Sequence, residues 1–203
     1  MNDKIISTYQ DRFPCLQRVA DKLRGCLQDL LAETPRIDAV SARAKNVDSF
    51  VVKAMKVLPS GNLKYNAPLI EIQDQIGARI VVYYIDDVKI VADVLERYFR
   101  QVERQDHVPD SHWEFGYFGR HWIFALPGDV IPRDVDVGDV PRFFELQVKT
   151  LFQHAWSETN HDLAYKEKKL TSDQKRRFAY TAAQAWGADR VLEELRCELD
   201  GRE

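Results

Sequence analysis

The sequence has few cysteines and no apolar segment of membrane-spanning length. Its three cysteines, Cys15, Cys26 and Cys197, are odd in number, far apart and in no CxxC pair. This spacing argues against a disulfide framework or a zinc knuckle and favours a reducing compartment. No stretch approaches the roughly 18 apolar residues that would cross a bilayer, and no basic segment with an apolar run opens the chain. We therefore expect a cytoplasmic protein with no membrane partner.

An excess of positive charge and the commonest nucleotide and hydrolase motifs are also absent. The net charge is −3 with 30% charged residues, so the molecule as a whole is not a basic nucleic-acid binder. Any phosphate or nucleic-acid site must therefore lie in a local basic cluster. There is no GxxxxGK[ST], GxGxxG, GxSxG or HExxH, so a P-loop nucleotidase, a dinucleotide enzyme, an α/β-hydrolase and a zincin lack support.

The hydrophobic pattern predicts one α/β (α+β) domain over residues 1–203. With 203 residues, of which 45% are hydrophobic, the chain can bury a full core. Helix and strand periods alternate and predict a mixed sheet of about four to five strands flanked by helices. The expected helices are 3–33 (interrupted near Pro14), 46–58, 86–100, the second half of 141–166, and 173–199; the expected strands are 36–44, 78–85, 121–126 and the first half of 141–166. The polar, turn-rich stretches 101–119 and 127–141 are expected as loops.

Residues 141–166 combine a half-buried strand with a helix, and polar groups line up at the join. Apolar and polar side chains alternate through the strand, so one face is buried. The polar set is Glu145, Gln147 and Lys149. His154, Glu158 and His161 then share one side of the helix. This arrangement suits the wall of an active site, but a solvated edge strand gives the same alternation. The histidine face can bind a metal or can pair with other groups inside the fold.

A basic set surrounds the expected start of the helix at 46–58. It comprises Arg43, Lys45, Ser49, Lys53 and Lys56, with the last three on one helical face. Backbone N–H groups and the dipole at a helix N-terminus favour anions, so this set suits a polyphosphate. A solvated basic helix face is the alternative interpretation.

Two acids stand at the expected strands. Asp74 precedes the buried strand, Gly77 allows a close backbone approach, Arg79 begins the strand, and Glu145 lies on the strand at 141–150. If the two strands are neighbours, both acids point into one cleft. Acids that hold Mg²⁺ beside cations that hold phosphate oxygens are the ingredients of phosphoryl or pyrophosphoryl transfer.

Five short motifs follow one another between residues 36 and 170. They are RxKxxxSxxxK from Arg43 to Lys53, DQIGAR from Asp74 to Arg79, Gly116-Tyr117 followed by His121, ELQVKT from Glu145 to Thr150, and HAWSE with HDxxYK from His154 to Lys166. In order and spacing they resemble the synthetase domain of the RelA/SpoT family. Because the sequence shows no hydrolase region or regulatory tail, it looks like a small stand-alone synthetase.

The resemblance implies a nucleotidyltransferase-like fold and transfer of the β,γ-pyrophosphate of ATP to a ribose 3′-hydroxyl, with release of AMP. It implies Mg²⁺ as cofactor, with Asp74 binding the metal and Glu145 sharing it or taking the proton of the hydroxyl. The implied ATP-binding residues are Arg43, Lys45, Ser49, Lys53, Lys56 and Arg79. The implied acceptor-binding residues are Tyr117, which would stack on the base, together with His121, Gln147, Lys149 and His154.

The acceptor side departs from the family pattern. Phe118-Gly119-Arg120-His121 replaces Arg-Ser-Leu-His, and the preceding VPDSHWEFG replaces a lysine-rich stretch. The resemblance implies GDP or GTP as acceptor, giving (p)ppGpp. The alternative is the 3′-end of tRNA, as in toxins of the family that lack the same lysines. A basic set that suits RNA phosphates, or a merely solvated helix start, comprises Lys166, Lys168, Lys169, Lys175, Arg176 and Arg177.

Three further points stay open at the level of sequence. A catalytically silent, nucleotide-binding regulator is a third hypothesis, which predicts ATP binding without AMP formation. The long terminal helices can support a homo-oligomer. The sequence does not indicate whether an antitoxin protein partners the chain, nor whether GDP or GTP is preferred.

Overall fold

The fold is built on a five-stranded mixed sheet. The computed structural model describes residues 2–107, 115–116, 119–166 and 170–201. The strands are β1 (Ile37–Ala44), β2 (Ile76–Val82), β3 (Gln101–His107), β4 (Gly119–Ala125) and β5 (Phe143–Thr150). Their order is β1-β2-β5-β4-β3, with β2 and β5 parallel and each other neighbouring pair antiparallel. The mixed sheet of four or five strands predicted from the sequence is confirmed.

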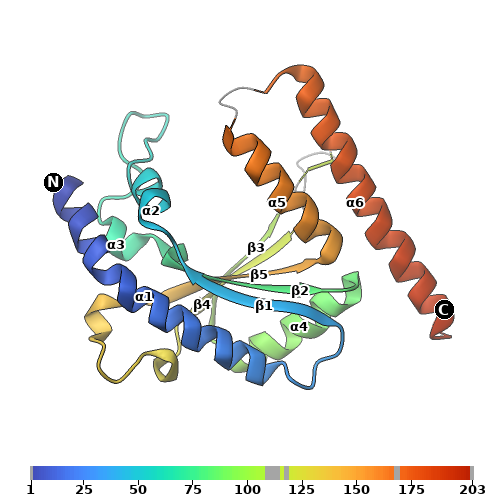
Figure 1. Ribbon diagram of the computed structural model, residues 1–203, viewed down its shortest axis with the longest axis horizontal. Coiled ribbons are helices and arrows are strands. Elements are labelled where there is room, and N and C mark those ends of the chain that lie inside the picture. The colour runs from blue at the N-terminus through green and yellow to red at the C-terminus, as the bar shows by residue number, and fades with distance from the viewer. Residues whose placement is uncertain (1, 108–114, 117–118, 167–169, 202–203) are drawn as a thin grey trace.

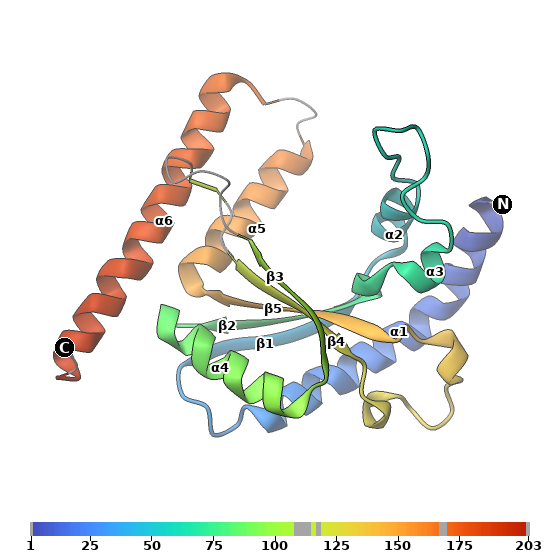
Figure 2. The same ribbon diagram turned by 180° about the vertical axis from the view of Figure 1, so that it is seen from behind.

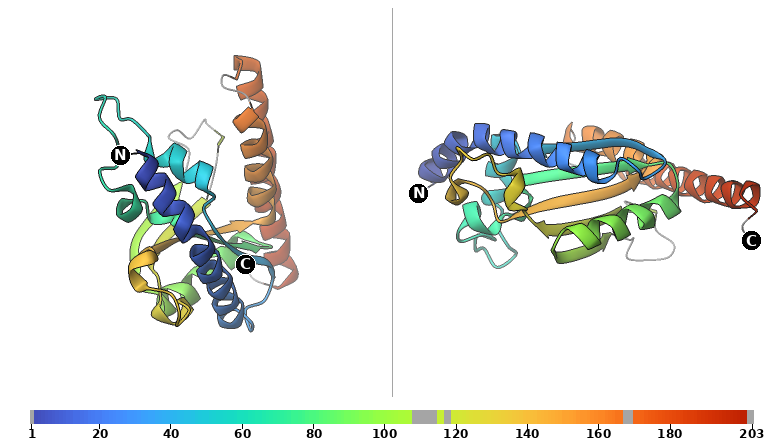
Figure 3. Two further views of the ribbon diagram at one scale, coloured as in Figure 1. Left: turned by 60° about the vertical axis from the view of Figure 1, so that its left-hand side comes forward. Right: turned by 90° about the horizontal axis from the view of Figure 1, so that it is seen from below.

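Two helices cover one face of this sheet, α1 (Asn2–Leu30) and α4 (Ile85–Tyr98), and both run across it in the view from below (Figure 3). The buried side chains Leu16, Leu23 and Leu27 of α1 belong to the same core cluster as Leu146 of β5. Helix α1 continues through Pro14, which it contains in its first half. Because proline removes only one backbone donor, the packing of the helix on the sheet can outweigh that loss.

The other helices rise from the opposite face. Helices α5 (Leu151–Lys166) and α6 (Ser172–Leu199) lie side by side at one end of the sheet, and α2 (Val47–Ala54) and the short α3 (Pro68–Glu71) lie at the other (Figures 1 and 2). Part of the sheet between these two groups is therefore left without a covering helix. The capping box at Thr171, whose side chain accepts from Gln174 N, begins α6 where the sequence predicts it.

Three predictions about the elements were wrong. The first is the interruption near Pro14, since α1 is continuous there. Residues 101–107 form β3 and not a loop, because QVERQDH pairs with β4 at the edge of the sheet, where both faces tolerate polar side chains. Helix α2 ends at Ala54 and not at residue 58, since Val57 and Leu63 form an isolated β-bridge directly after it. Within the described parts of the chain, no helix combines the length and the apolarity of a membrane span.

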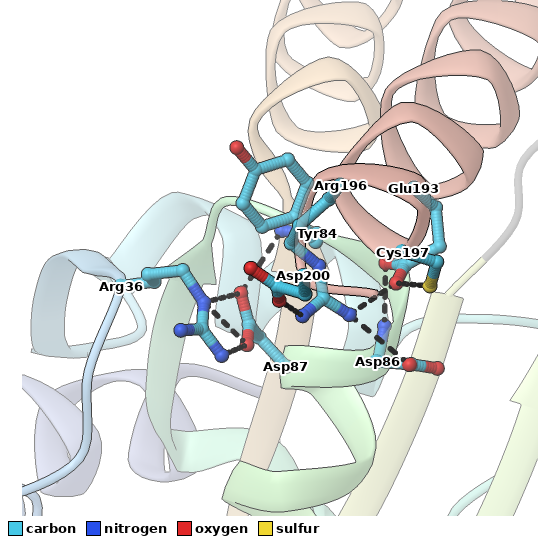
Figure 4. Close-up of polar contacts among 8 residues, drawn as sticks. All are labelled: Arg36, Tyr84, Asp86, Asp87, Glu193, Arg196, Cys197 and Asp200. Atoms are coloured by element: carbon cyan, nitrogen blue, oxygen red, sulfur yellow. Dashed lines mark hydrogen bonds and ion pairs between the residues drawn. The ribbon is translucent and has the colours of Figure 1, made fainter. Parts of the chain in front are cut away.

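One polar network joins the C-terminal end of α6 to the start of α4 and to the turn before β1. We call it the α6 clamp (Figure 4); its members are Arg36, Tyr84, Asp86, Asp87, Glu193, Arg196, Cys197 and Asp200. Arg36, with a φ of 60°, donates to Asp87 at 2.7 Å. The buried Arg196 guanidinium contacts Glu193, Asp86 at 3.1 Å and Asp200 at 3.3 Å, and lies over the Tyr84 ring. The clamp thereby fixes α6 at the end opposite its N-terminus.

Candidate active site

A cleft of about 300 Å³ opens on the uncovered face of the sheet. It lies over β1, β2 and β5, beside the N-terminus of α2. Its lining residues are Ser41, Ala42, Arg43, Ala44, Lys45, Asn46, Ser49, Asp74, Gly77, Ala78, Arg79, Glu145 and Gln147. The sequence predicts that Asp74 and Glu145 point into one cleft, and the pairing of β2 with β5 places both there.

Strand register builds the floor of the cleft from two rows of residues. In one row, Gly77 of β2 lies between Arg43 of β1 and Glu145 of β5. A Cβ atom added at Gly77 would meet nothing within 4 Å, so the missing side chain leaves open space. In the next row, Arg79 lies between Ser41 and Gln147. Because alternate residues of a strand share a face, both rows point to the same side.

Helix α1 packs against the junction between β1 and α2 and fixes its position. The Tyr9 ring stacks on Phe50 with centroids 3.7 Å apart, and its hydroxyl donates to the Lys45 carbonyl at 2.7 Å. Burial and the nearby Asp74 charge raise the pKa of Tyr9, so the phenol keeps its proton. Asn46 begins α2, with its side-chain oxygen accepting a hydrogen bond from Ser49 N at 2.7 Å. The result is a fixed helix N-terminus at the rim of the cleft.

Asp74 is the meeting point of the basic residues. Its Oδ2 atom lies 2.8 Å from Lys53 Nζ and 3.1 Å from Lys45 Nζ. Its Oδ1 atom is buried and has no hydrogen-bond partner among the residues that the structure describes. A buried carboxylate oxygen without a donor is costly. This oxygen is therefore placed to accept a cation or a donor from a bound ligand.

Glu145 is held by two neighbours on the sheet. His121 Nδ1 lies 2.7 Å from Glu145 Oε1, and Gln147 Nε2 donates to the same oxygen at 3.3 Å. Burial by itself raises the pKa of Glu145, but the bond and charge of His121 and the bond from Gln147 outweigh it and lower the pKa overall. The carboxylate therefore stays ionised in the cleft.

The donor set at the cleft fits Mg²⁺. This ion binds oxygen, and it typically uses one or two carboxylates together with substrate phosphates and water. Asp74, in the 3-10 turn Gln73–Gln75 before β2, and Glu145, on β5, supply the two carboxylates. The Asp74 Oδ1 atom, which has no partner among the described residues, is one available ligand atom. The His154, Glu158 and His161 side of α5 does not form a metal cluster in the described chain, where the one candidate group is Asp86, Glu193 and Cys197.

Helix α5 reaches the cleft through Arg79. Arg79 Nη1 lies 2.9 Å from Glu158 Oε1 and 3.4 Å from His154 Nδ1, while the buried Nε atom has no partner among the described residues. His154 and Glu158 thus both contact Arg79, which agrees with the interpretation of this helix side as a pairing face, although the Glu158 side chain is 51% exposed. Burial, together with the charge of Arg79, lowers the pKa of His154, so this imidazole is predominantly neutral at pH 7.

Lys149 lies beyond Gln147 on the same face of β5 and is 3% exposed. Burial, reinforced by the positive charge of Arg79, lowers its pKa to about 8. The Nζ atom donates to Ser157 Oγ of α5 at 3.2 Å. Lys149 therefore ties α5 to the sheet beside the cleft, and it does not line the cleft itself.

The structure thus brings most of the predicted site residues together and separates others. Lys56 is exposed beyond the end of α2, so its predicted place on one helical face with Ser49 and Lys53 is wrong. Tyr117 lies outside the described residues, as do Lys168 and Lys169 of the basic set. The sequence analysis placed Glu158 on the polar side of the helix with His154 but did not predict its contact with Arg79.

Comparisons with known proteins agree with this geometry. The family model described as the region found in RelA / SpoT proteins matches residues 42–170. The chain is 28% identical over 169 residues to GTP pyrophosphokinase YjbM of Bacillus subtilis (strain 168), covering 80% of this chain and 74% of that protein.

Solved structures share the fold. A GTP pyrophosphokinase family protein from Streptococcus pneumoniae superposes with a TM-score of 0.76 at 22% identity, covering 94% of each chain. Small alarmone synthetase 1 from Bacillus subtilis, bound to its product pppGpp, gives a TM-score of 0.74 at 24% identity, covering 94% of this chain and 97% of that one. The predicted fold class is confirmed.

Proposed function

The chain belongs to the RelA/SpoT family, and from that premise we propose that its cleft transfers the β,γ-pyrophosphate of ATP to the 3′-hydroxyl of GDP or GTP. AMP is the second product. The related YjbM is named a GTP pyrophosphokinase, and small alarmone synthetase 1 is bound to its product pppGpp. We further propose that residues 1–203 act as one domain, because α1 shares its core with the sheet that carries the site.

One observation supports the proposal: a carboxylate from the turn before β2 and a carboxylate on the adjacent strand β5 face a set of cations across an open cleft. Asp74 and Glu145 line the cleft with Arg43, Lys45 and Arg79. Pyrophosphoryl transfer demands both kinds of group, since phosphate oxygens need cations and a divalent metal needs carboxylates.

The positions of the cleft residues suggest a different role for each group. Arg43, Lys45 and Ser49 lie at the N-terminus of α2, and Lys53, in the last turn of α2, reaches Asp74 at 2.8 Å. These four residues would hold the phosphates of ATP. Asp74 and Glu145 would hold Mg²⁺, which when bound neutralises charge on the transferred group. The 3′-hydroxyl oxygen bonds to the β-phosphorus as the bond from that phosphorus to the α,β-bridging oxygen breaks.

The proton of the attacking hydroxyl needs an acceptor near Glu145. The ionised Glu145 is one such acceptor, and His121 Nδ1 at 2.7 Å would hold this carboxylate in position. Gln147 and His121 occupy paired positions on β5 and β4 and would contact the acceptor nucleotide. His154 of α5 and Lys149 of β5 lie beside the cleft and would contact the acceptor from that side.

Transfer to the 3′-end of tRNA is the second candidate. The observation that favours it is that Arg120, a cation of β4 next to the acceptor residue His121, is already paired, with its guanidinium 3.7 Å from Asp106. Of the basic set near α6, Arg177 pairs with Asp173 at 2.7 Å and is 73% exposed. Such exposed positions suit the salt-dependent binding of an RNA backbone.

A transfer assay separates these candidates. Purified protein, γ-labelled ATP and Mg²⁺ would be incubated with GDP, GTP or bulk tRNA in separate tubes. We expect label on GDP or GTP; label on RNA alone would replace the proposed acceptor by tRNA. ATP binding without AMP formation on any acceptor would show a silent regulator. Omitting Mg²⁺, or replacing it by Mn²⁺ or Ca²⁺, tests the proposed metal.

Glu145→Gln provides the matched active-site variant, and Asp93→Asn, at an exposed position of α4, provides its control. The amide keeps the shape of Glu145 but loses its charge, so AMP release should fall steeply in this variant alone. Equal activity in both variants would remove Glu145 from the mechanism.

A further inference from the structure

Helix α6 carries a buried acid that touches the strand of the cleft. Asp189 is 4% exposed, and its Oδ2 atom accepts a hydrogen bond from Thr150 Oγ1 at 2.7 Å. Its Oδ1 atom is buried without a partner among the described residues, beside a small cavity of about 20 Å³. Burial raises the pKa of Asp189 to about 6, against the opposing effect of the Thr150 bond. Asp189 lies outside residues 42–170, which the family model matches.

Thr150 ends β5 and also begins α5. Its hydroxyl oxygen accepts from Gln153 N at 3.1 Å, and its backbone N–H donates to Gln153 Oε1 at 3.2 Å. This reciprocal pair is a capping box, in which a threonine and a glutamine three residues later satisfy each other's backbone donors. No loop separates the strand from the helix, so this cap sets the direction in which α5 leaves the sheet.

Asp189 determines how the Thr150 hydroxyl is used. A hydroxyl has one proton to donate and two lone pairs to accept with. Because the proton points to the Asp189 carboxylate, the lone pairs are left for Gln153 N. An acceptor-only group at position 189 therefore selects the orientation in which Thr150 caps the helix.

The first turns of α5 then carry the groups that hold Arg79. His154 and Glu158 contact the Arg79 guanidinium, whose side chain lines the cleft. Glu145 and Gln147 lie on β5 just before the cap. The Thr150 junction is thus the covalent link between the residues on the floor of the cleft and the residues that orient Arg79.

We propose that Asp189 is a positioning residue, which acts through the Thr150 cap to set α5 so that Glu158 and His154 hold Arg79 across the cleft. Its effect on turnover rests on the proposed function, whereas its effect on α5 does not. A carboxylate that only filled space between α6 and the sheet would stabilise the fold but would not be coupled to Glu158.

The test compares Asp189→Ala and Thr150→Val with three reference variants. Thr150→Ser keeps the hydroxyl, Asp189→Asn keeps the shape, and Glu194→Ala removes an exposed acid from the same helix. Hydrogen exchange of the α5 amides is measured first, since it needs no substrate. We expect exchange in the first turn of α5 to accelerate about five- to tenfold in Asp189→Ala and Thr150→Val, as for loss of a helix cap. Thr150→Ser and Glu194→Ala should match the unaltered protein.

A double-mutant cycle with Glu158→Gln supplies the second measurement, read as kcat/KM for AMP release and as binding of ATP. If Asp189 acts through Glu158, then Asp189→Ala should lower kcat/KM about tenfold when Glu158 is present and much less when Glu158→Gln is also present. Additive losses, or α5 exchange in Asp189→Ala equal to that in Glu194→Ala, would overturn the proposal.

Failure of the proposed function can be distinguished from failure of the proposed role of Asp189. If the unaltered protein releases no AMP with any acceptor, the proposed function fails, and α5 exchange together with the ATP-binding cycle still decides the role of Asp189. If Asp189→Ala does not fold, Thr150→Val against Thr150→Ser gives the same comparison at the other end of the bond.

Discussion

The cleft and the α6 clamp are both clusters of opposite charges, but they differ in what their charges leave unused. In the clamp, Arg36 is matched by Asp87, and Arg196 is matched by three carboxylates and stacked on Tyr84. In the cleft, the buried Oδ1 of Asp74 and Nε of Arg79 have no partner among the described residues, and open space lies over Gly77. The clamp also contains one buried nitrogen without a partner among the described residues, Arg196 Nε. The unpartnered atoms of Asp74 and Arg79 differ from it because their residues line an open cleft, where a ligand can reach them.

The difference teaches that density of charge does not mark a functional site. Asp86, Glu193 and Cys197 offer ligand atoms within 4.8 Å of one another, which resembles a metal site. Yet Arg196 contacts both carboxylates and the Asp86 N–H donates to Glu193, so these oxygens are already in use. Unused bonding capacity beside a hollow is the better criterion.

The largest effect is expected for a substitution of Asp74, whose Oδ1 atom has no partner in the cleft among the described residues. Asp74→Asn should lower kcat about 10³-fold, because the bound metal supplies several kcal/mol of stabilisation. The free energy of unfolding should change by less than about 1 kcal/mol, since both lysine partners are partly exposed. AMP release and urea unfolding measure the two effects, with Asp93→Asn as control. Activity near that of the control would contradict the role of Asp74.

The opposite result is expected for the clamp. Arg196→Met should lower the free energy of unfolding by about 2 kcal/mol, because it leaves Glu193, whose side chain is only 14% exposed, without its guanidinium partner, while the other partners are more exposed. At a temperature well below the unfolding midpoint, KM for ATP should not change. A rise in KM without loss of stability would show that the clamp belongs to the active site.

Lys149 provides a test by pH, because its pKa of about 8 lies below that of an unfolded lysine. The unfolded chain binds this proton more tightly, so folding is penalised below pH 8 and stability recovers as the pH rises from 8 toward 10. The recovery should be about 2 kcal/mol in the unaltered protein relative to Lys149→Met. Urea unfolding at pH 8, 9 and 10 measures it; parallel pH profiles for the two proteins would contradict the shift.

The smallest effect concerns the open space over Gly77. Gly77→Ala should raise KM for ATP roughly five- to tenfold, about 1 kcal/mol, because a methyl group enters the cleft that the phosphates need. Stability should be unchanged or slightly higher, since the added Cβ meets nothing within 4 Å and glycine is unfavourable in a strand. Gly77→Val, which adds a larger side chain, should raise KM for ATP further. Unchanged binding in both variants would place the nucleotide elsewhere.

Much of the fold and of the cleft could be predicted because local patterns encode them. The alternation of Glu145 and Gln147 with apolar neighbours indicates strand β5, and a capping residue such as Asn46 indicates the start of helix α2 after β1. Strand β3 could not be predicted this way, because an edge strand with polar residues on both faces has no alternation.

The contacts between distant segments were beyond pattern reasoning. Asp189 and Thr150 are 39 residues apart, and nothing in a helical period shows which acid is buried. Arg79 was expected at the nucleotide, and sequence alone does not show that α5 holds one of its nitrogens through Glu158. Such pairings depend on the angle between elements, which the whole fold determines.

Because β5 passes directly into α5, the number of residues between the strand and a helix position determines where that position points. Each residue of a helix turns it by about 100°, so one inserted residue after Thr150 would rotate Glu158 to another side of α5. No loop is present here to absorb the change, in contrast to the 127–141 connection between β4 and β5. The interval from Glu145 to Glu158 is therefore fixed in length as well as in composition, and insertions within it should be the least tolerated in the molecule.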